Sequence, residues 1–515
     1  MKGWKRYLPA YDVIVVGAGL GGLSSTLKLS HEGASVLLLE RHNMTGGCAT
    51  SFVRGRYEFE ASLHELCECG DGKDGRTYGG VRKFFDSVGL YPEYVMVPEA
   101  FRVSMSKLGL DFKMPFGIEN AIAAIDAADP GSGPKVREYF RLLQEVYEAL
   151  LYINECDGSP DPKVMTTKYS SFLRTASYSV YEINEYFKFS EITRHIMNTY
   201  YGYVTRSLKD LSFTVWALMI YLYINDGAHI INSTSHALAV DMERRARELG
   251  AQVETNVEVS RLIVENGAVC GVVTADGDEI RAKRVLCNLS PNLVYTRMMD
   301  KKDVPLQALK LTGARRLGAS IFSAYLGLNA LPEDIGIDTY EYFITEDMDV
   351  ERVYEMSKKW QVTTKTSATC PDIAIPGLTG PDRCQLNFTC LYAPDAMLGH
   401  LDPKTYLQNK EAFVSKLIDI YEKTTGARIR EHIEEIAIAT PATFVRYENT
   451  PKGNIYGYQL SPVDGIVPRT LAIQEEQYMP GLDFVGGYGR RAHGFSCSII
   501  NGYDTACDSL KKIGR

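Results

Sequence analysis

The sequence lacks an excess of positive charge. Its 515 residues include 56 lysines and arginines and 64 aspartates and glutamates, which gives a formal net charge of −8. A protein that binds nucleic acid normally shows a basic excess or a basic stripe. We therefore expect no nucleic-acid partner.

Long apolar runs and an N-terminal secretory signal are also absent. The uncharged run at residues 211–225 (LSFTVWALMIYLYIN) has 15 residues, whereas a membrane-spanning helix needs about 20. We interpret this run as a buried helix. The alternative is an apolar wall of a lipid pocket, or a surface that rests on a membrane. The expected location is cytoplasmic, and peripheral contact with a membrane stays open.

Patterns of metal ligands are scarce as well. The 11 cysteines are scattered without metal-ligand spacing, and Cys67-Glu68-Cys69 is the one close pair. We interpret them as ordinary reduced thiols and predict no metal site. The hydrophobic content of 45% and the charged content of 23% are typical of a folded protein. The length allows two or three domains.

The N-terminal segment has the pattern of a dinucleotide-binding unit. Residues 12–16 (DVIVV) form a short apolar run typical of a buried parallel strand. Residues 17–22 (GAGLGG) match G-x-G-x-x-G, and a helical pattern follows to about residue 32. A second strand (SVLLLE) ends on Glu40. Strand, glycines, helix, strand and acid in this order predict a dinucleotide site.

Each residue of this motif has a mechanical reason. Gly17 permits a tight turn, Gly19 lets the backbone approach a pyrophosphate, and Gly22 lets helix and strand pack closely. Glu40 lies 18 residues after Gly22, where an acid accepts hydrogen bonds from ribose hydroxyls and disfavours a 2′-phosphate. The predicted cofactor contacts are Gly17, Ala18, Gly19, Leu20, Gly21, Gly22 and Glu40.

A second glycine pair favours FAD over NAD as the cofactor. Gly46-Gly47 follow shortly after Glu40, and a NAD domain has no need for them. The longer FAD molecule runs on past the first helix and needs further close backbone contact. The sequence has no second G-x-G-x-x-G for a separate nicotinamide domain, so the electron donor or acceptor is unknown. The predicted FAD site therefore also includes Arg41, Gly46, Gly47 and Cys48.

Three stretches carry a resemblance to a known family. Residues 17–52 (GAGLGGLSSTLKLSHEGASVLLLERHNMTGGCATSF) resemble the flavoprotein superfamily of amine oxidases and phytoene desaturases. Residues 55–66 (GRYEFEASLHEL) and 440–462 (TPATFVRYENTPKGNIYGYQLSP) are similar to its phytoene desaturase, carotenoid isomerase and retinol saturase branch. That branch usually has Asp in place of Glu60 and Gly in place of Ser62.

The resemblance implies an α/β fold, with a discontinuous Rossmann-type FAD-binding domain and an inserted α+β substrate domain. Residues 1–100, 226–300 and 436–515 would form the FAD-binding domain, and residues 101–225 and 301–435 the substrate-binding domain. A helix from about Ser496 would point at the pyrimidine end of the flavin, where its dipole stabilises negative charge. The resemblance adds Val259, Gly486, Gly487, Ser498 and Ile499 to the FAD site.

The activity that the resemblance implies is that of an FAD-dependent oxidoreductase. It would desaturate, saturate or isomerise carbon–carbon double bonds of a hydrophobic small molecule, such as a carotenoid, a retinoid or an unsaturated fatty acid. Two alternatives stay open. One is a flavin amine oxidase, and the other is a non-enzymatic escort protein of the same fold that binds prenyl or lipid groups.

Candidate catalytic residues come from two places in the chain. His64 has a suitable unperturbed pKa for proton transfer, and Glu65 would serve if it is desolvated. Arg490, Arg491 and His493 stand in a loop that is mostly glycine, proline and small residues in the carotenoid desaturases. A cation there would raise the electron affinity of a flavin or hold a substrate carboxylate. The alternative is an ion pair with the pyrophosphate or with a surface acid.

Overall fold

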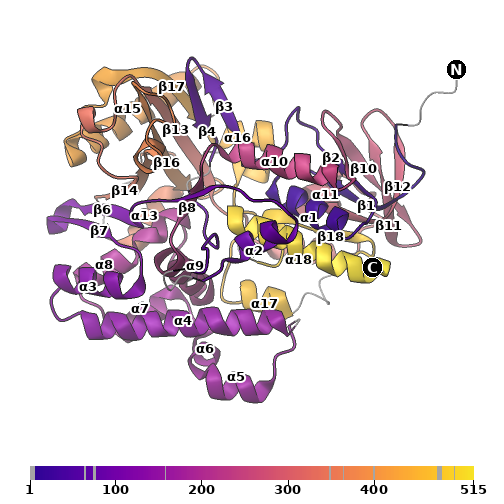
Figure 1. The fold of residues 1–515 in the computed structure, drawn as a ribbon, viewed down its shortest axis with the longest axis horizontal. Coiled ribbons are helices and arrows are strands. Elements are labelled where there is room, and N and C mark those ends of the chain that lie inside the picture. The colour runs from indigo at the N-terminus through magenta and orange to yellow at the C-terminus, as the bar shows by residue number, and fades with distance from the viewer. Residues whose placement is uncertain are drawn as a thin grey trace.

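The protein is built around two sheets that lie side by side, each with its own helices (Figure 1). A computed structural model describes residues 6–62, 65–73, 77–156, 158–346, 349–362, 365–397, 401–471, 478–491 and 493–515. The predicted catalytic residue His64 lies outside the described residues. Within them, no helix combines the length and the apolarity that crossing a membrane requires.

The first sheet contains the strands predicted from the N-terminal motif. β1 is buried over its whole length because it lies in the middle of a parallel sheet. The second half of β12 pairs with β1 and β18, and its first half pairs antiparallel with β11. The strands are β1 (Tyr11–Val16), β2 (Val36–Leu39), β9 (Gln252–Glu254), β10 (Val259–Glu265), β11 (Ala268–Thr274), β12 (Glu279–Cys287) and β18 (Leu482–Phe484).

Helices cover one face of this sheet, and the β10–β11 hairpin with two short helices covers the other. Gly502 lets α18 pack closely on α1, because a Cβ at this position would lie 2.3 Å from the carbonyl oxygen of Gly21. The helices of the first face are α1 (Leu20–His31), α2 (Gly80–Ser87), α10 (Ser235–Glu248) and α18 (Phe495–Ile513). Those of the second face are α11 (Pro291–Arg297) and α12 (Leu306–Ala314).

The second sheet has the strand order β17-β13-β16-β15-β14-β6-β7. All its neighbouring strands run antiparallel except β14 and β6, which are parallel. Its strands are β6 (Phe101–Met105), β7 (Leu110–Met114), β13 (Ser320–Leu328), β14 (Glu341–Thr345), β15 (Lys365–Thr369), β16 (Cys384–Tyr392) and β17 (Ile433–Ala439). The predicted α/β class with an α+β insertion is confirmed.

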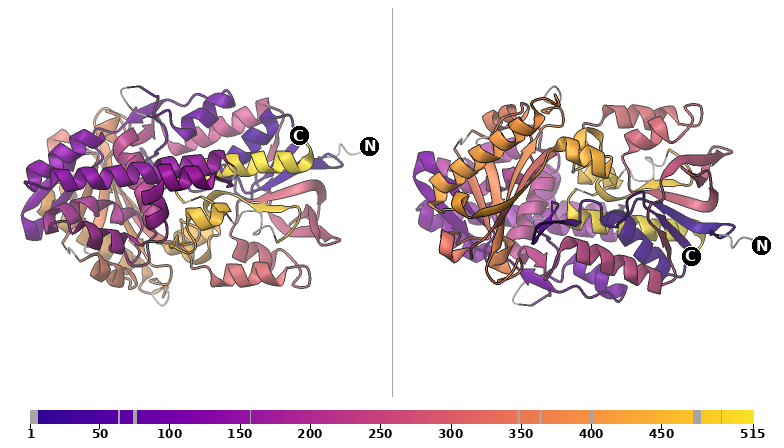
Figure 2. Two further views of the ribbon diagram at one scale, coloured as in Figure 1. Left: turned by 90° about the horizontal axis from the view of Figure 1, so that it is seen from below. Right: turned by 90° about the horizontal axis from the view of Figure 1, so that it is seen from above.

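A layer of helices accompanies the second sheet, and the long α4 runs along its outer side (Figure 2). α4 buries residues at helical spacing, including Val136, Tyr139, Leu143 and Val146, which gives it one apolar face. These helices are α3 (Ile118–Ala128), α4 (Gly133–Glu155), α5 (Pro162–Lys168), α6 (Ser170–Thr175), α7 (Val180–Phe187), α8 (Glu191–Met197) and α9 (Phe213–Asp226).

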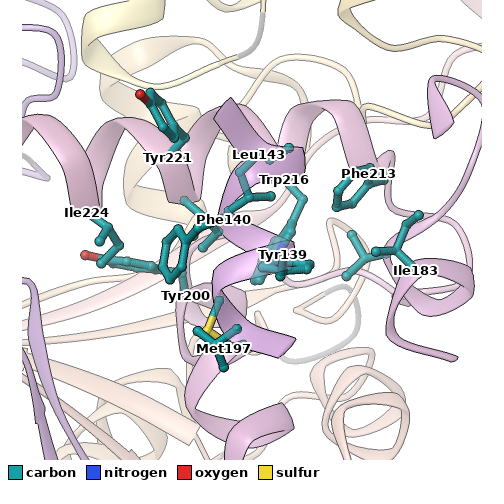
Figure 3. Close-up of a cluster of buried hydrophobic side chains, with 14 of the residues drawn as sticks. Tyr139, Phe140, Leu143, Ile183, Met197, Tyr200, Phe213, Trp216, Tyr221 and Ile224 are labelled. Atoms are coloured by element: carbon teal, nitrogen blue, oxygen red, sulfur yellow. The ribbon is translucent and has the colours of Figure 1, made fainter. Parts of the chain in front are cut away.

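α9 forms from the uncharged run noted in the sequence, and it packs against α4 in the core of this half (Figure 3). Trp216 is fully buried, and its indole Nε1 donates a hydrogen bond of 3.1 Å to the Tyr139 hydroxyl. An indole N–H usually finds such a partner when it is buried. The predicted buried helix is therefore confirmed.

The remaining elements connect the two halves or border them. One difference from the predicted domain limits appears at residue 436, because β17 spans it and pairs with β13 of the second sheet. The connecting elements are β3 (Ser51–Arg54), β4 (Tyr57–Glu60), β5 (Tyr94–Met96), β8 (His229–Ile231), α13 (Val350–Ser357), α14 (Pro371–Ala374), α15 (Tyr406–Thr425), α16 (Pro441–Glu448) and α17 (Ile466–Leu471).

Candidate functional site

A cavity of about 1200 Å³ is lined by residues from both halves of the protein. It exceeds the roughly 300–1,000 Å³ of most small-molecule sites, so it has room for a large cofactor together with a substrate. One part of its lining comes from the loops at the carboxyl ends of β1 and β2. This is the edge at which α/β proteins bind ligands. Another part comes from α9, β13 and β17.

The glycine motif after β1 forms one wall of the cavity. Gly17 has a positive φ of 95°, and a Cβ at Gly22 would lie 2.0 Å from the Gly17 carbonyl oxygen. Both positions therefore require glycine for the turn itself. A Cβ at Gly19 would instead meet the side chain of Asn288. Of the predicted contacts, Gly17, Gly19, Leu20 and Gly21 line the cavity, whereas Ala18 and Gly22 support the turn from behind.

Glu40 lies at the end of β2 and also lines the cavity. Its two carboxylate oxygens accept hydrogen bonds from the backbone N–H groups of Ala18 (2.7 Å) and His42 (2.8 Å). The Glu40 carbonyl accepts from the N–H of Val257, which brings the start of β10 to the same wall. Val259 lines the cavity there, where the resemblance places the adenine edge.

The second glycine pair meets the first across the cavity wall. The N–H of Gly46 donates to the Ala18 carbonyl at 2.8 Å, and a Cβ at Gly47 would lie 3.1 Å from the Cα of Gly19. Both glycines have positive φ and line the cavity, as does Cys48. Burial raises the pKa of the Cys48 thiol well above its usual range, so this thiol is neutral.

Arg41 lines the cavity but already has protein partners. Its Nη2 donates to the carbonyl oxygen of Tyr447 at 2.9 Å and to that of Arg446 at 3.4 Å. These carbonyls belong to α16, so Arg41 ties the loop after β2 to this helix.

The C-terminal element closes the same part of the cavity. α18 begins at Phe495, and its first turn, residues 495–498, lines the cavity and directs its free N–H groups toward it. Gly487 and Ser498 line the cavity, whereas Gly486 lies behind it with a positive φ of 69°. Ile499 is fully buried in the core of the first half, and its carbonyl accepts a hydrogen bond from Ser24.

Arg490 and Arg491 do not line the cavity. Arg491 Nε lies 2.7 Å from a carboxylate oxygen of Asp504, and Arg490 reaches Asp504 at 3.6 Å and Asp508 at 3.4 Å. Both acids project from α18. The two guanidinium groups therefore fasten the loop to this helix, which agrees with the ion-pair alternative for them.

His493 lines the cavity and stacks on Tyr456, with ring centroids 4.4 Å apart and an interplanar angle of 15°. Burial lowers the pKa of His493 to about 3, and the nearby charges of Arg469 and Arg206 lower it in the same direction. The imidazole is therefore neutral at physiological pH. It can exchange a hydrogen bond with a ligand, but it supplies no positive charge.

Glu65 lines the cavity with only 6% of its surface exposed. Burial raises the pKa of Glu65 well above its usual range, and the neighbouring carboxyl of Glu341 raises it further. Tyr203, which also lines the cavity, donates to the Oε2 of Glu65 at 3.5 Å. Sequence reasoning missed Tyr203 and Glu341, because both lie in the insertions, where no motif points to them.

α9 supplies an apolar wall to the cavity. Val215, Leu218, Met219 and Leu222 line it from one side of the helix, together with Tyr223. The opposite side of α9 packs into the core, so the buried-helix interpretation and the pocket-wall alternative both hold for this segment. Among the described residues, no group of three or more His, Cys, Asp or Glu side chains is placed to hold a metal ion.

Comparisons with known proteins agree with this arrangement. Residues 15–86 match the model of a family described as an NAD(P)-binding Rossmann-like domain. The chain is 24% identical over 488 residues to an all-trans-retinol 13,14-reductase of Danio rerio, covering 87% of this chain and 77% of that protein. It is 22% identical over 519 residues to a 4,4′-diapolycopene oxygenase of Methylomonas sp, covering 95% and 96%. The predicted resemblance is confirmed.

A solved structure of wild-type putrescine oxidase bound to putrescine shares the fold. It aligns with a TM-score of 0.65 at 16% identity, over 98% of this chain and 99% of that one. At this identity the likeness concerns the fold alone. It supports the Rossmann-type sheet with its large second sheet.

Proposed function

We propose that the protein is an FAD-dependent oxidoreductase that desaturates, saturates or isomerises carbon–carbon double bonds of a hydrophobic, lipid-like or conjugated small molecule. One observation carries this proposal. The glycine motifs, Glu40 and the first turn of α18 line the same cavity as the apolar side of α9. A cofactor and an apolar substrate would therefore meet in one space. The two relatives described above are named for a retinol and a diapolycopene, which agrees with such a substrate.

The residues present fit FAD. Gly19 and Gly47 present bare backbone to the cavity, the first turn of α18 offers free N–H groups, and Glu40 offers a carboxylate to ribose hydroxyls. When bound, the flavin supplies or accepts a hydride. Gly17, Gly46 and Val259 would hold the nucleotide half, and Gly487 and Ser498 would border the flavin.

The chain's own side chains divide the remaining work. The apolar side of α9 would orient the substrate and exclude water from it. Glu65 and His493 face the cavity as uncharged groups that can hold or exchange a proton. Arg490 and Arg491 act at a distance from the cavity, because their ion pairs with α18 fix the loop that carries His493.

The test begins with the colour of the purified protein, which should show the visible absorption band of bound flavin. The flavin is then reduced anaerobically and reoxidised against polyenes, retinoids and unsaturated fatty acids, and the spectrum is followed. A colourless protein that does not take up added FAD would overturn the enzyme proposal and favour a lipid-binding escort. Flavin reduction by amines with release of hydrogen peroxide would favour an amine oxidase.

A further inference from the structure

A pair of carboxyl groups lies beside the cavity at Glu65 and Glu341. Glu341 belongs to β14 and is completely buried, without lining the cavity itself. Tyr203 joins the two, because its hydroxyl bonds to the Oε2 of Glu341 and lies 3.5 Å from the Oε2 of Glu65. Among the described residues, the buried Oε1 of Glu65 finds no hydrogen-bond partner. An unpartnered buried oxygen on a side chain that lines the cavity indicates a group made to meet a ligand.

The geometry places one shared proton on this pair of carboxyl groups. A tyrosine hydroxyl carries a single hydrogen, so it cannot donate to both carboxylates at once. The Tyr203 hydroxyl can therefore stabilise only one of the two as a carboxylate. Two carboxylates this close in a water-poor site also cannot both ionise, since each charge disfavours the other.

The surroundings keep this proton on the pair. The charges that act most on Glu65 after Glu341 come from another acid, Glu99, which precedes β6. Among the described residues, four further tyrosines interact electrostatically with the pair, and burial raises the pKa of each, so they are uncharged at neutral pH. They are Tyr200, Tyr223, Tyr340 and Tyr456.

We propose that Glu65 exchanges a proton with the substrate through its Oε1, and that Tyr203 and Glu341 are positioning residues that set the pH range over which Glu65 holds that proton. This inference rests on the proposed function. Reduction of a double bond adds a hydride to one carbon, for which reduced flavin is the chemical source, and a proton to the other. The O–H bond of Glu65 breaks as the new C–H bond forms. Water in the cavity, which Glu65 lines, then returns a proton to Glu65. In the desaturating direction each transfer is reversed.

The first test is isotope-edited infrared spectroscopy of the protein with ¹³C-labelled glutamate, recorded as a function of pH. The wild type should show a protonated-carboxyl band at neutral pH that is absent from E65Q. E341Q removes the repelling acid, so the band should disappear at lower pH than in the wild type. Y203F removes a donor that stabilises the carboxylate, so the band should persist to higher pH.

The matched control is Glu60→Gln. Glu60 is another buried carboxyl, with a pKa that burial raises to about 7, but it binds Ser235 at the start of α10 and does not line the cavity. E60Q should remove a different band, and the pH at which the Glu65 band disappears should stay as in the wild type. A spectrum that is the same in wild type and E65Q would overturn the protonated state of Glu65. A Glu65 band that neither E341Q nor Y203F shifts would overturn the roles of Tyr203 and Glu341.

The second test follows turnover with the polyene that responds in the flavin assay. E65Q should lower the rate by about 10²–10⁴-fold, the usual contribution of a general acid, at unchanged flavin content, and E60Q should not. A rate for E65Q within about twofold of wild type would overturn the role of Glu65. The infrared measurement needs no flavin, so a failure to bind FAD would overturn the proposed function without changing the infrared result.

Discussion

The protonation state of His493 gives the sharpest check on the electrostatics of the cavity. Burial lowers its pKa to about 3, against about 6.5 for a free imidazole. At pH 5 a group with a pKa near 3 is about 1% protonated, whereas a free imidazole is about 97% protonated. In histidine labelled with ¹³C at Cε1, the His493 resonance, assigned by its loss in H493F, should therefore stay at its neutral position from pH 8 to pH 5.

The same shift has a consequence for stability, and its sign follows from linkage. A histidine whose folded pKa is lowered stabilises the fold above the unfolded pKa, and this contribution is lost as pH falls from about 6.5 toward 3. Between pH 7 and pH 5 the loss is about 2 kcal/mol, from 1.5 pH units at about 1.4 kcal/mol each. H493F removes this component, so its stability relative to wild type should rise by about 2 kcal/mol over that interval.

Tyr456→Phe serves as the control, because it keeps the ring on which His493 stacks and removes no imidazole. The difference in unfolding free energy between Y456F and wild type, measured with urea, should be the same at pH 7 and pH 5. A His493 resonance that titrates with a midpoint at or above about 6.5 would refute the reasoning. It would also restore a positive charge to the cavity.

Two further sets of substitutions test the glycine turn and the closing loop. Gly19→Ala should leave the melting temperature nearly unchanged, because its only close contact would be with the movable side chain of Asn288. It should weaken FAD binding at least tenfold in a flavin titration, because the new methyl group and the displaced Asn288 would crowd the cavity that both residues line. Gly22→Ala should destabilise the protein by about 1–3 kcal/mol in thermal or urea unfolding, because its Cβ would overlap a backbone oxygen; equal effects of the two would contradict this assignment. Asp504→Ala removes the partner of two arginines and should cost about 2–4 kcal/mol of unfolding free energy, between the values for exposed and buried ion pairs. A loss below about 0.5 kcal/mol would mean that this ion-pair cluster does not fasten the loop.

The glycine turn and Glu40 were predictable because they lie close together in the sequence. The turn that joins the strand to the helix has its glycines at positions 17, 19 and 22, as a dinucleotide site requires. The position of Glu40 follows from the length of the helix and strand that come after this turn. The helix of residues 211–225 was predictable for a similar reason, since its apolar run is a local feature of the sequence. Its use as a cavity wall needed the second sheet, which supplies the facing side.

The role of Arg490 and Arg491 was not settled by the sequence, although a signal was present. Asp504 and Asp508 stand four residues apart on the following helix, so they share one face of it. A loop that folds back along that helix brings both arginines onto this face. Which way the loop folds depends on tertiary packing, including the hydrogen bond from the N–H of Arg491 to the side chain of Asn501. The pair of Glu65 and Glu341 was out of reach, because 276 residues separate them in the chain.

The placement of these groups bears on the charge of the substrate. The described residues of the loop 486–494 bring no positive charge to the cavity, because Arg490 and Arg491 point to α18 and His493 is neutral. Glu65 is also uncharged, and α9 adds only apolar and tyrosine side chains to its wall. A carboxylate that left water for this wall would give up its hydration without gaining a cation from the loop. An uncharged polyene or alcohol loses far less. We therefore expect the neutral members of the substrate panel to reoxidise or reduce the flavin more readily than their carboxylate counterparts, the reverse of what three cations in the loop would favour.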